Sequence, residues 1–182
     1  CGFADNGNYV ITLGGSDDEY VYTHSLSTPY DISTKSGTTS THSQTSSYYK
    51  PHVKIAKWAT DGTKLYTVND DHGSVGDSGY LIQRNATTPF NGGTATGGTS
   101  YNTRAAWNQG IYGTIQDFTF SHDGSKLYVL LSDYMLYENI LTTPWEINTS
   151  YWSGKSYDLS SKLPYNIQIT DDGTKMHIHS GS

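Results

Sequence analysis

The chain has 182 residues and a formal net charge of −6, with only 11 Lys and Arg residues. This acidic balance disfavours nucleic-acid binding, which needs clustered positive charge. No apolar stretch approaches the length that crosses a bilayer, so we expect no membrane span. The single cysteine, Cys1, excludes an internal disulfide.

A turn motif recurs four times along the chain. Its copies are Asn6-Gly7, Asp61-Gly62, Asp123-Gly124 and Asp172-Gly173, and the last three read Asp-Gly-(Thr/Ser)-Lys. Asp-Gly favours a hairpin, because glycine accepts a positive φ and the Asp side chain bonds the backbone two residues on. Apolar residues alternate before the turns, at 56–58, 118–120 and 167–169, which predicts strands with one buried face. The segments after the turns, 10–13, 65–68 and 127–131, are apolar on both faces, which predicts inner strands.

A second marker, (Ser/Thr)-Thr-Pro-aromatic, occurs at 27–30, 87–90 and 142–145. It follows a predicted third strand at 20–22, 80–82 and 135–137, which the proline ends because it cannot donate to the ladder. The polar stretch before the next repeat has room for a fourth, outer strand. We therefore expect an all-β, β-propeller-like fold in a single repeat domain, 1–182. It would contain three four-stranded antiparallel blades, 1–54, 55–115 and 116–165, and a half blade, 166–182.

The Asp-Gly-Thr-Lys-Leu-Tyr hairpin resembles the YVTN/PD40-type propeller repeats. Together with Thr-Pro-Trp-(Asp/Glu)-Ile, it is similar to a repeat in secreted bacterial and phage-encoded proteins, including tail-associated ones. The resemblance covers residues 3–182 and implies the propeller fold, but propellers host enzymes, binders and scaffolds alike. The first repeat departs from the pattern at Asn8-Tyr9, and the second has Asn91-Gly92 in place of the acidic-Ile pair.

The number of repeats is too small for a closed propeller, and more than one hypothesis explains this. Propellers typically close with about 4 to 8 blades, more than the three and a half expected here. One hypothesis is an excerpt of a longer polypeptide, and the absence of an initial Met also suggests processing or an excerpt. The other is completion by a further copy, giving a ring or a filament. Cys1 as the lipid-bearing first residue of a mature lipoprotein is a third possibility.

Two groups of residues are candidate metal ligands. His177 and His179 lie on one face of a predicted strand, a spacing that suits zinc if further ligands join them. Loop carboxylates suit Ca²⁺, and the candidates are Asp17, Asp18, Asp70, Asp71 and Asp77. The alternatives are solvated turn residues and a His177 that replaces the Tyr of the repeat. We expect no cofactor, with Ca²⁺ as the alternative.

Aromatic residues outside the recurring positions are candidates for sugar recognition by stacking. They are Tyr101, Trp107, Tyr112, Tyr151 and Trp152. The alternative for Trp107 and Trp152 is packing between blades as outer-strand residues. The glycine-containing insertion at 91–115 is the most irregular segment, and exposed loops on rigid scaffolds commonly carry binding residues.

No motif for nucleophilic catalysis or phosphate binding is present. We therefore expect a non-catalytic module for binding, adhesion or structural assembly, located outside the cell, on a cell surface or on a virion. Its partners would be a glycan or protein on a cell surface, or copies of itself. One alternative is a self-assembling ring or filament subunit completed by strand exchange. Another is a polysaccharide-acting enzyme, whose paired carboxylates would be recognisable only in three dimensions.

Overall fold

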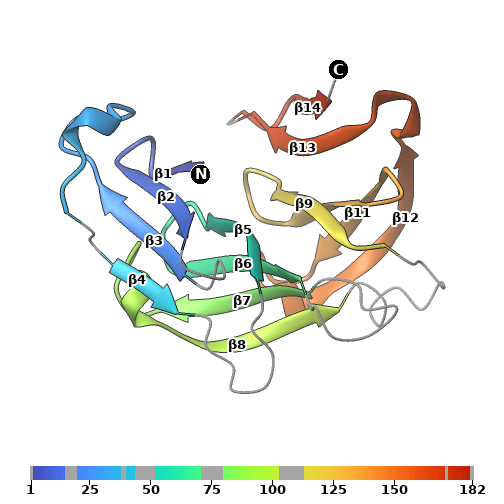
Figure 1. Cartoon of the computed structure of the whole chain (residues 1–182). Coiled ribbons are helices and arrows are strands. Elements are labelled where there is room, and N and C mark those ends of the chain that lie inside the picture. Colours follow the sequence, from blue (N-terminus) through green and yellow to red (C-terminus); the bar gives the residue numbers. More distant parts are fainter. Residues whose placement is uncertain are drawn as a thin grey trace. The chain divides into compact units, whose positions relative to one another are not determined.

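The computed structural model describes residues 2–14, 20–37, 40–43, 52–70, 80–102, 113–170 and 172–180 (Figure 1). These residues form three sheets of four antiparallel strands and one sheet of two, each with its strands in sequence order. The prediction of an all-β fold with three four-stranded blades and a half blade is confirmed. No helix in the described part of the chain has the length and hydropathy to cross a membrane.

The chain divides into two compact units. The first comprises Cys1–Val75 and Tyr80–Ser100, and the second comprises Gly76–Gly79 and Tyr101–Ser182. The first unit holds blade 1, made of β1 (Gly2–Ala4), β2 (Tyr9–Gly14), β3 (Tyr20–Ser25) and β4 (Ser40–Ser43). It also holds most of blade 2, made of β5 (His52–Trp58), β6 (Lys64–Asp70), β7 (Tyr80–Ala86) and β8 (Ala95–Asn102). Strand β5 begins ahead of the boundary expected at residue 55, since the alternation of buried Val53 with exposed Lys54 already belongs to it.

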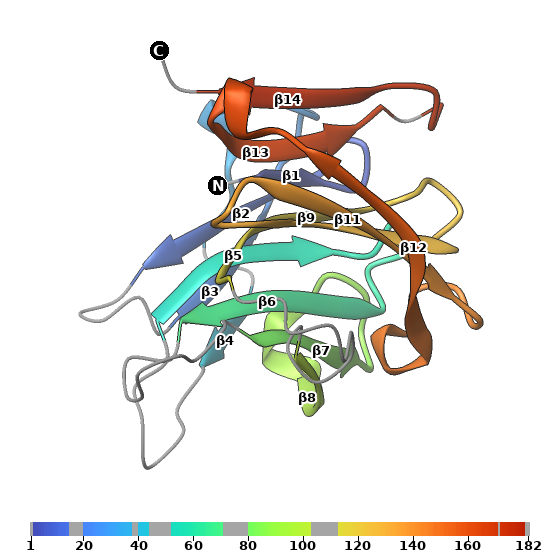
Figure 2. The same ribbon diagram turned by 90° about the vertical axis from the view of Figure 1, so that its right-hand side faces the viewer.

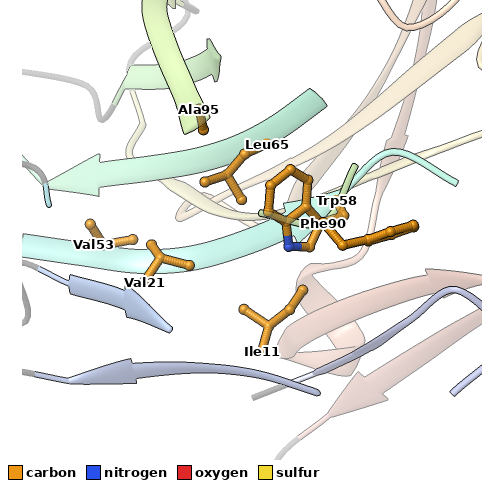
Figure 3. Packing of buried hydrophobic residues seen from close by; sticks show 7 residues of the cluster. All are labelled: Ile11, Val21, Val53, Trp58, Leu65, Phe90 and Ala95. Carbon is orange, nitrogen blue, oxygen red and sulfur yellow. The ribbon is translucent and has the colours of Figure 1, made fainter. Parts of the chain in front are cut away.

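The two blades of the first unit share one hydrophobic core. Its buried members are Ile11, Val21, Val53, Trp58, Leu65, Phe90 and Ala95, drawn from β2 and β3 on one side and from blade 2 on the other (Figure 3). The Trp58 indole Nε1 donates a hydrogen bond of 3.2 Å to Thr23 Oγ1, which is buried in β3. Since a buried indole N–H needs a partner, this bond fixes how Trp58 enters the core between the two sheets.

His42, in the outer strand β4 of blade 1, forms hydrogen bonds with the backbone of blade 2. Burial, together with the positive charge of Arg84, lowers the pKa of His42 to about 4, although backbone hydrogen bonds to Gly92 and Ala95 act in the opposite direction. The imidazole is therefore neutral at pH 7. Gly92 begins the short 3-10 helix η2 (Gly92–Thr94), which precedes β8.

The second unit holds blade 3 and a two-stranded sheet. Blade 3 consists of β9 (Ile115–Phe120), β10 (Lys126–Leu131), β11 (Met135–Leu141) and β12 (Ser150–Asp158), and the last sheet pairs β13 (Pro164–Ile169) with β14 (Met176–Ser180). Figure 2 shows this hairpin beside blade 3, with β14 as its outer strand. Buried Leu130, Leu159 and Ile167 form the core between them. The buried Asp117 carboxylate also accepts a hydrogen bond of 2.9 Å from the Ile167 backbone N–H.

Candidate functional site

The two sequence markers of each repeat meet in one local structure, which we call the aromatic cap. The residue after each proline, Tyr30, Phe90 or Trp145, adopts a positive φ of 63°, 56° or 66°. Its backbone N–H donates a hydrogen bond of 3.0 Å to the carbonyl oxygen of the hairpin glycine, Gly7, Gly62 or Gly124. The aromatic ring then lies directly on that glycine, so the Thr-Pro-aromatic marker covers the turn that the glycine makes.

Close contact with the ring explains why these turn positions are glycine. A Cβ atom added to Gly7 would lie 2.6 Å from the Tyr30 ring, and one added to Gly62 or Gly124 would meet Phe90 or Trp145 in the same way. Each of the three glycines also has a positive φ, which side chains rarely adopt. Both constraints therefore act on the same residue.

A third residue of the cap escaped the sequence analysis. Thr34, Thr94 and Thr149 each stand six positions after the Thr that precedes the proline. The hydroxyl oxygen of each accepts a hydrogen bond of 3.1 Å from the backbone N–H of that earlier residue, Thr28, Thr88 or Thr143. It also donates to the backbone carbonyl of Asp31, Asn91 or Glu146. Strict spacing of Thr after Thr-Pro-aromatic was the signal that could have revealed it.

The acidic residues of the hairpins organise the turns. Asp61, Asp123 and Asp172 each accept a hydrogen bond from the backbone N–H two residues on, at 2.9, 3.0 and 3.0 Å. For Asp123, hydrogen bonds from the Ser121 and Ser125 side chains and from the Ser125 backbone lower the pKa to about 2. The first hairpin differs, because Asp5, Asn6 and Gly7 all have positive φ there.

The fourth hairpin repeats the turn without the cap. Thr170 and both donor groups of Thr174 bond to Asp172 and lower its pKa to about 2, as at Asp123. Gly173 again has a positive φ, of 69°. Among the described residues, however, no ring lies on it, and a Cβ added there would meet only His122 Cβ at 3.7 Å. This hairpin is therefore a turn of the same kind, but no described aromatic ring covers its glycine.

The two candidate aromatic residues of β12 lie on opposite faces of the sheet. Tyr151 pairs with Ile140 and is 49% exposed, whereas Trp152 pairs with buried Asn139 and is half-buried. Neighbouring residues of a strand point to opposite faces, so these two rings do not form one surface. The Trp152 indole Nε1 also donates to the Lys155 carbonyl, 3.2 Å away. The side chain of Tyr101 and all of Trp107 and Tyr112 lie outside the described part of the chain.

A second exposed tyrosine joins Tyr151, and the sequence analysis missed it. Tyr157 is 65% exposed and pairs with Leu136, while Tyr151 pairs with Ile140. Cross-strand partners share a face, and residues 136 and 140 of β11 lie on the same face because their spacing is even. The two tyrosines are thus about 13 Å apart along one face of blade 3 at the usual rise per strand residue. Residues 151 and 157 are six positions apart in β12, so the alternation of side chains along a strand was the signal that could have placed both tyrosines on one face.

Between these tyrosines lies a hydrogen-bonded carboxylate, Glu138. Lys126 Nζ lies 3.0 Å from its Oε2, Lys155 Nζ lies 3.4 Å from its Oε1, and the Tyr128 hydroxyl donates to Oε2 over 3.3 Å. Burial would raise the pKa of Glu138, but hydrogen bonds from Lys126 and Ser153 and the two lysine charges outweigh it, so the pKa is lowered. Hydrogen bonding to Glu138 correspondingly raises the pKa of Lys126. Charged donors and an acceptor therefore lie between the two exposed rings. We call this set the β12 face; its members are Glu138, Lys126, Lys155, Tyr151 and Tyr157.

The candidate metal ligands are not assembled into a site in the described residues. His177 and His179 are exposed on β14, opposite Gln168 and Asn166 of β13. Within the ranges that the structure describes, no group of three or more His, Cys, Asp or Glu side chains is placed to hold a metal ion. Asp17, Asp18, Asp71 and Asp77, and the side chain of Asp70, lie outside those ranges. The Ca²⁺ hypothesis stays a prediction.

Comparison with known structures places the chain in a fold class. No protein family matches the sequence, and no curated protein matches it either. The fold is similar to the crystal structure of the C-terminal WD40 domain of Sif2, with a TM-score of 0.50 and 11% sequence identity. The match covers 98% of this chain and 44% of that one, so the chain spans less than half the length of the structure it matches. The repeated four-stranded antiparallel sheets and this likeness define a β-propeller-type fold.

Proposed function

We propose that this chain is a non-catalytic β-propeller module that binds a glycan or protein partner outside the cell, on a cell surface or on a virion. The observation that carries the proposal is the pair of exposed tyrosines on the β12 face, with the Glu138, Lys126 and Lys155 groups between them. Exposed aromatic rings flanking charged hydrogen-bonding groups suit a ligand with apolar ring faces and hydroxyl groups. An oligosaccharide has both.

Comparison with the other repeats supports a role for these rings beyond folding. Tyr151 follows the cap of blade 3, and the equivalent residues are Ser36 after the cap of blade 1 and Thr96 after that of blade 2. All three are exposed, so the blade itself does not require an aromatic residue there. An exposed ring on a rigid sheet loses little conformational entropy when it binds, which favours its use in recognition. Similarity to repeats of secreted bacterial and phage-encoded proteins fits an extracellular or virion location.

A glycan array probed with the whole 182-residue chain tests this proposal. We expect binding that falls about two- to tenfold in Tyr151→Ser and again in Tyr157→Ser, the range for the loss of one aromatic contact. Tyr165→Ser is the matched control, because Tyr165 is an equally exposed tyrosine (62%) of the same unit on β13. Equal losses in all three variants, or turnover of a bound polysaccharide by the wild-type chain, would contradict the proposal.

A further inference from the structure

The contact between blades 1 and 2 has two layers of different chemistry. The inner layer is the apolar core around Trp58, together with the hydrogen bond from Trp58 to Thr23. The outer layer is polar, and there β4 lies beside blade 2 and packs against η2 (Figure 1). A Cβ added to Gly93 would meet the Thr41 carbonyl oxygen at 3.8 Å, so the two backbones lie close together. Among the described residues of this contact, only His42 changes its charge between about pH 4 and 7.

His42 points from β4 into this outer layer. It pairs with Val21 of β3, a buried member of the shared core, and cross-strand partners share a face. Its half-buried ring forms hydrogen bonds with the backbone of Gly92 and Ala95. Blade 3 has a fully buried isoleucine, Ile147, at the position of Gly92. Since glycine has no side chain to occupy this place, the imidazole can reach the backbone of blade 2.

The hydrogen bonds of His42 indicate which ring nitrogen carries the proton. Its Nε2 atom is buried and has no hydrogen-bond partner within the described part of the chain. The backbone bonds therefore involve Nδ1, and they raise the pKa of His42, as bonds donated to carbonyl oxygens do. The neutral ring thus carries its proton on Nδ1. Protonation would add a buried N–H at Nε2 with no acceptor among the described residues, and such a donor is costly.

A positive charge faces the same ring from blade 2. Arg84 pairs with buried Leu65 of β6, so its side chain lies on the face that meets blade 1. Its Nη1 donates to Thr67 Oγ1 over 3.0 Å, and burial lowers its pKa to about 10, which leaves it charged at neutral and acidic pH. Among the described residues, the other groups around His42 carry no charge, since β3 opposes it with Val21 and η2 consists of two glycines and a threonine. A charge on His42 would therefore be repelled by Arg84, with no described carboxylate to offset it.

We propose that His42 makes the outer contact between blades 1 and 2 a pH switch. With a neutral ring, β4 is held on η2. When the ring takes up a proton, the added N–H at Nε2 and the charge of Arg84 make this position unfavourable, and β4 leaves blade 2 with the imidazole in water. Histidines that are neutral in a buried contact and charged outside it are a common basis of pH sensing.

The release is local because the two layers differ in chemistry. Strand β4 has only four residues, Ser40–Ser43, and once it loses η2 only its pairing with β3 holds it. The inner layer does not titrate, since it consists of apolar contacts and the bond from Trp58 to Thr23. Acid would therefore uncover the outer edge of β3 and the backbone of η2 while the blades stay joined. The switch is independent of ligand binding at the β12 face, so either proposal can fail without the other.

Hydrogen exchange of the whole chain measures the release of β4. The pKa of His42 is about 4 while β4 is bound and returns toward the ordinary 6.5 when the ring is in water. The lowered pKa stabilises the bound state fully above pH 6.5, and this contribution is lost as the pH falls toward about 4. Protection factors at 40–43, corrected for intrinsic exchange, should therefore fall on the order of thirtyfold between pH 7.5 and pH 5. Protection in β5 should change little, because β5 belongs to the inner layer.

Variants separate this switch from general acid denaturation. His42→Gln still donates a hydrogen bond but does not titrate, so it should lose the acid response at 40–43. His177→Gln is the matched control, because His177 is an exposed histidine of the other unit, and it should keep the response. The ring ¹³C signal of His42 in the wild-type chain should titrate below about pH 5, a measurement that requires no variant to fold. A midpoint near 6.5, an acid response that persists in His42→Gln, or equal loss of protection in β4 and β5 would overturn the proposal.

Discussion

The hairpins at Gly124 and Gly173 share the same turn hydrogen bonds, but among the described residues an aromatic ring covers only the first glycine. In both, hydroxyl and backbone donors hold the Asp side chain and lower its pKa to about 2. Trp145 lies on the first glycine, whereas no described ring lies on the second. The comparison shows that local residues suffice for the turn itself. Covering the turn is a separate step that requires a segment beyond the next strand.

The capping rings of blades 1 and 2 differ in how deeply they are buried. Tyr30 lies on Gly7 as Phe90 lies on Gly62, yet Tyr30 is 60% exposed and Phe90 only 7%. Phe90 gains its burial from Tyr9, stacked at 4.7 Å between ring centroids, and from Trp58 at 5.8 Å. Blade 2 therefore uses its cap as part of the core shared with blade 1.

Replacing the two capping rings should give the largest difference. We expect Phe90→Ala to lower the free energy of unfolding by about 3–5 kcal/mol, since it removes a large buried side chain from the shared core. Tyr30→Ala should lower it by about 1 kcal/mol or less, because most of that ring is in water. Urea unfolding of the two variants measures both changes. Comparable losses would mean that the cap stabilises its own hairpin and that burial between blades adds little.

Alanine at the two turn glycines should separate backbone strain from the clash with the ring. Gly124→Ala should lower the free energy of unfolding by about 2–5 kcal/mol, and Gly173→Ala by about 1–2 kcal/mol. Both substitutions force alanine to a positive φ, but only the first also drives a Cβ into Trp145. Gly37→Ala is the control, since no described atom lies within 4 Å of its added Cβ and its φ is ordinary. Equal effects at Gly124 and Gly173 would show that the ring is not in contact in solution.

The smallest effect concerns the titration of the turn carboxylates. Asp123 and Asp172 have a pKa of about 2, below the ordinary 3.8. A lowered pKa stabilises the folded turn fully above pH 3.8, and this contribution is lost as the pH falls toward about 2. Carboxyl ¹³C shifts should give the same midpoint for both residues, because the cap does not touch the carboxylates. A midpoint for Asp172 near 3.8 would indicate that the uncapped turn opens.

Several parts of the fold could be predicted from sequence because they depend on short spacings. Asp-Gly turns, alternating strands and the Thr-Pro turn that follows each third strand all express the preferences of neighbouring residues. The same regularity would have revealed Thr34, Thr94 and Thr149, whose spacing from the proline never varies. The β12 face could not be found in this way. Its members come from three strands, β10, β11 and β12, and the pairing of these strands brings Lys126, Glu138 and Lys155 together.

The sequence by itself determined the repeat, the strands and the chemistry of the four turns, since each depends on contacts within a few residues. Only the tertiary structure showed that the two markers of a repeat are two halves of one contact, with an aromatic ring on a glycine. It also decided which capping ring is buried and which is exposed, and that the turn at Gly173 has no cap among the described residues. Burial depends on which distant segments pack together, and neither composition nor spacing specifies that.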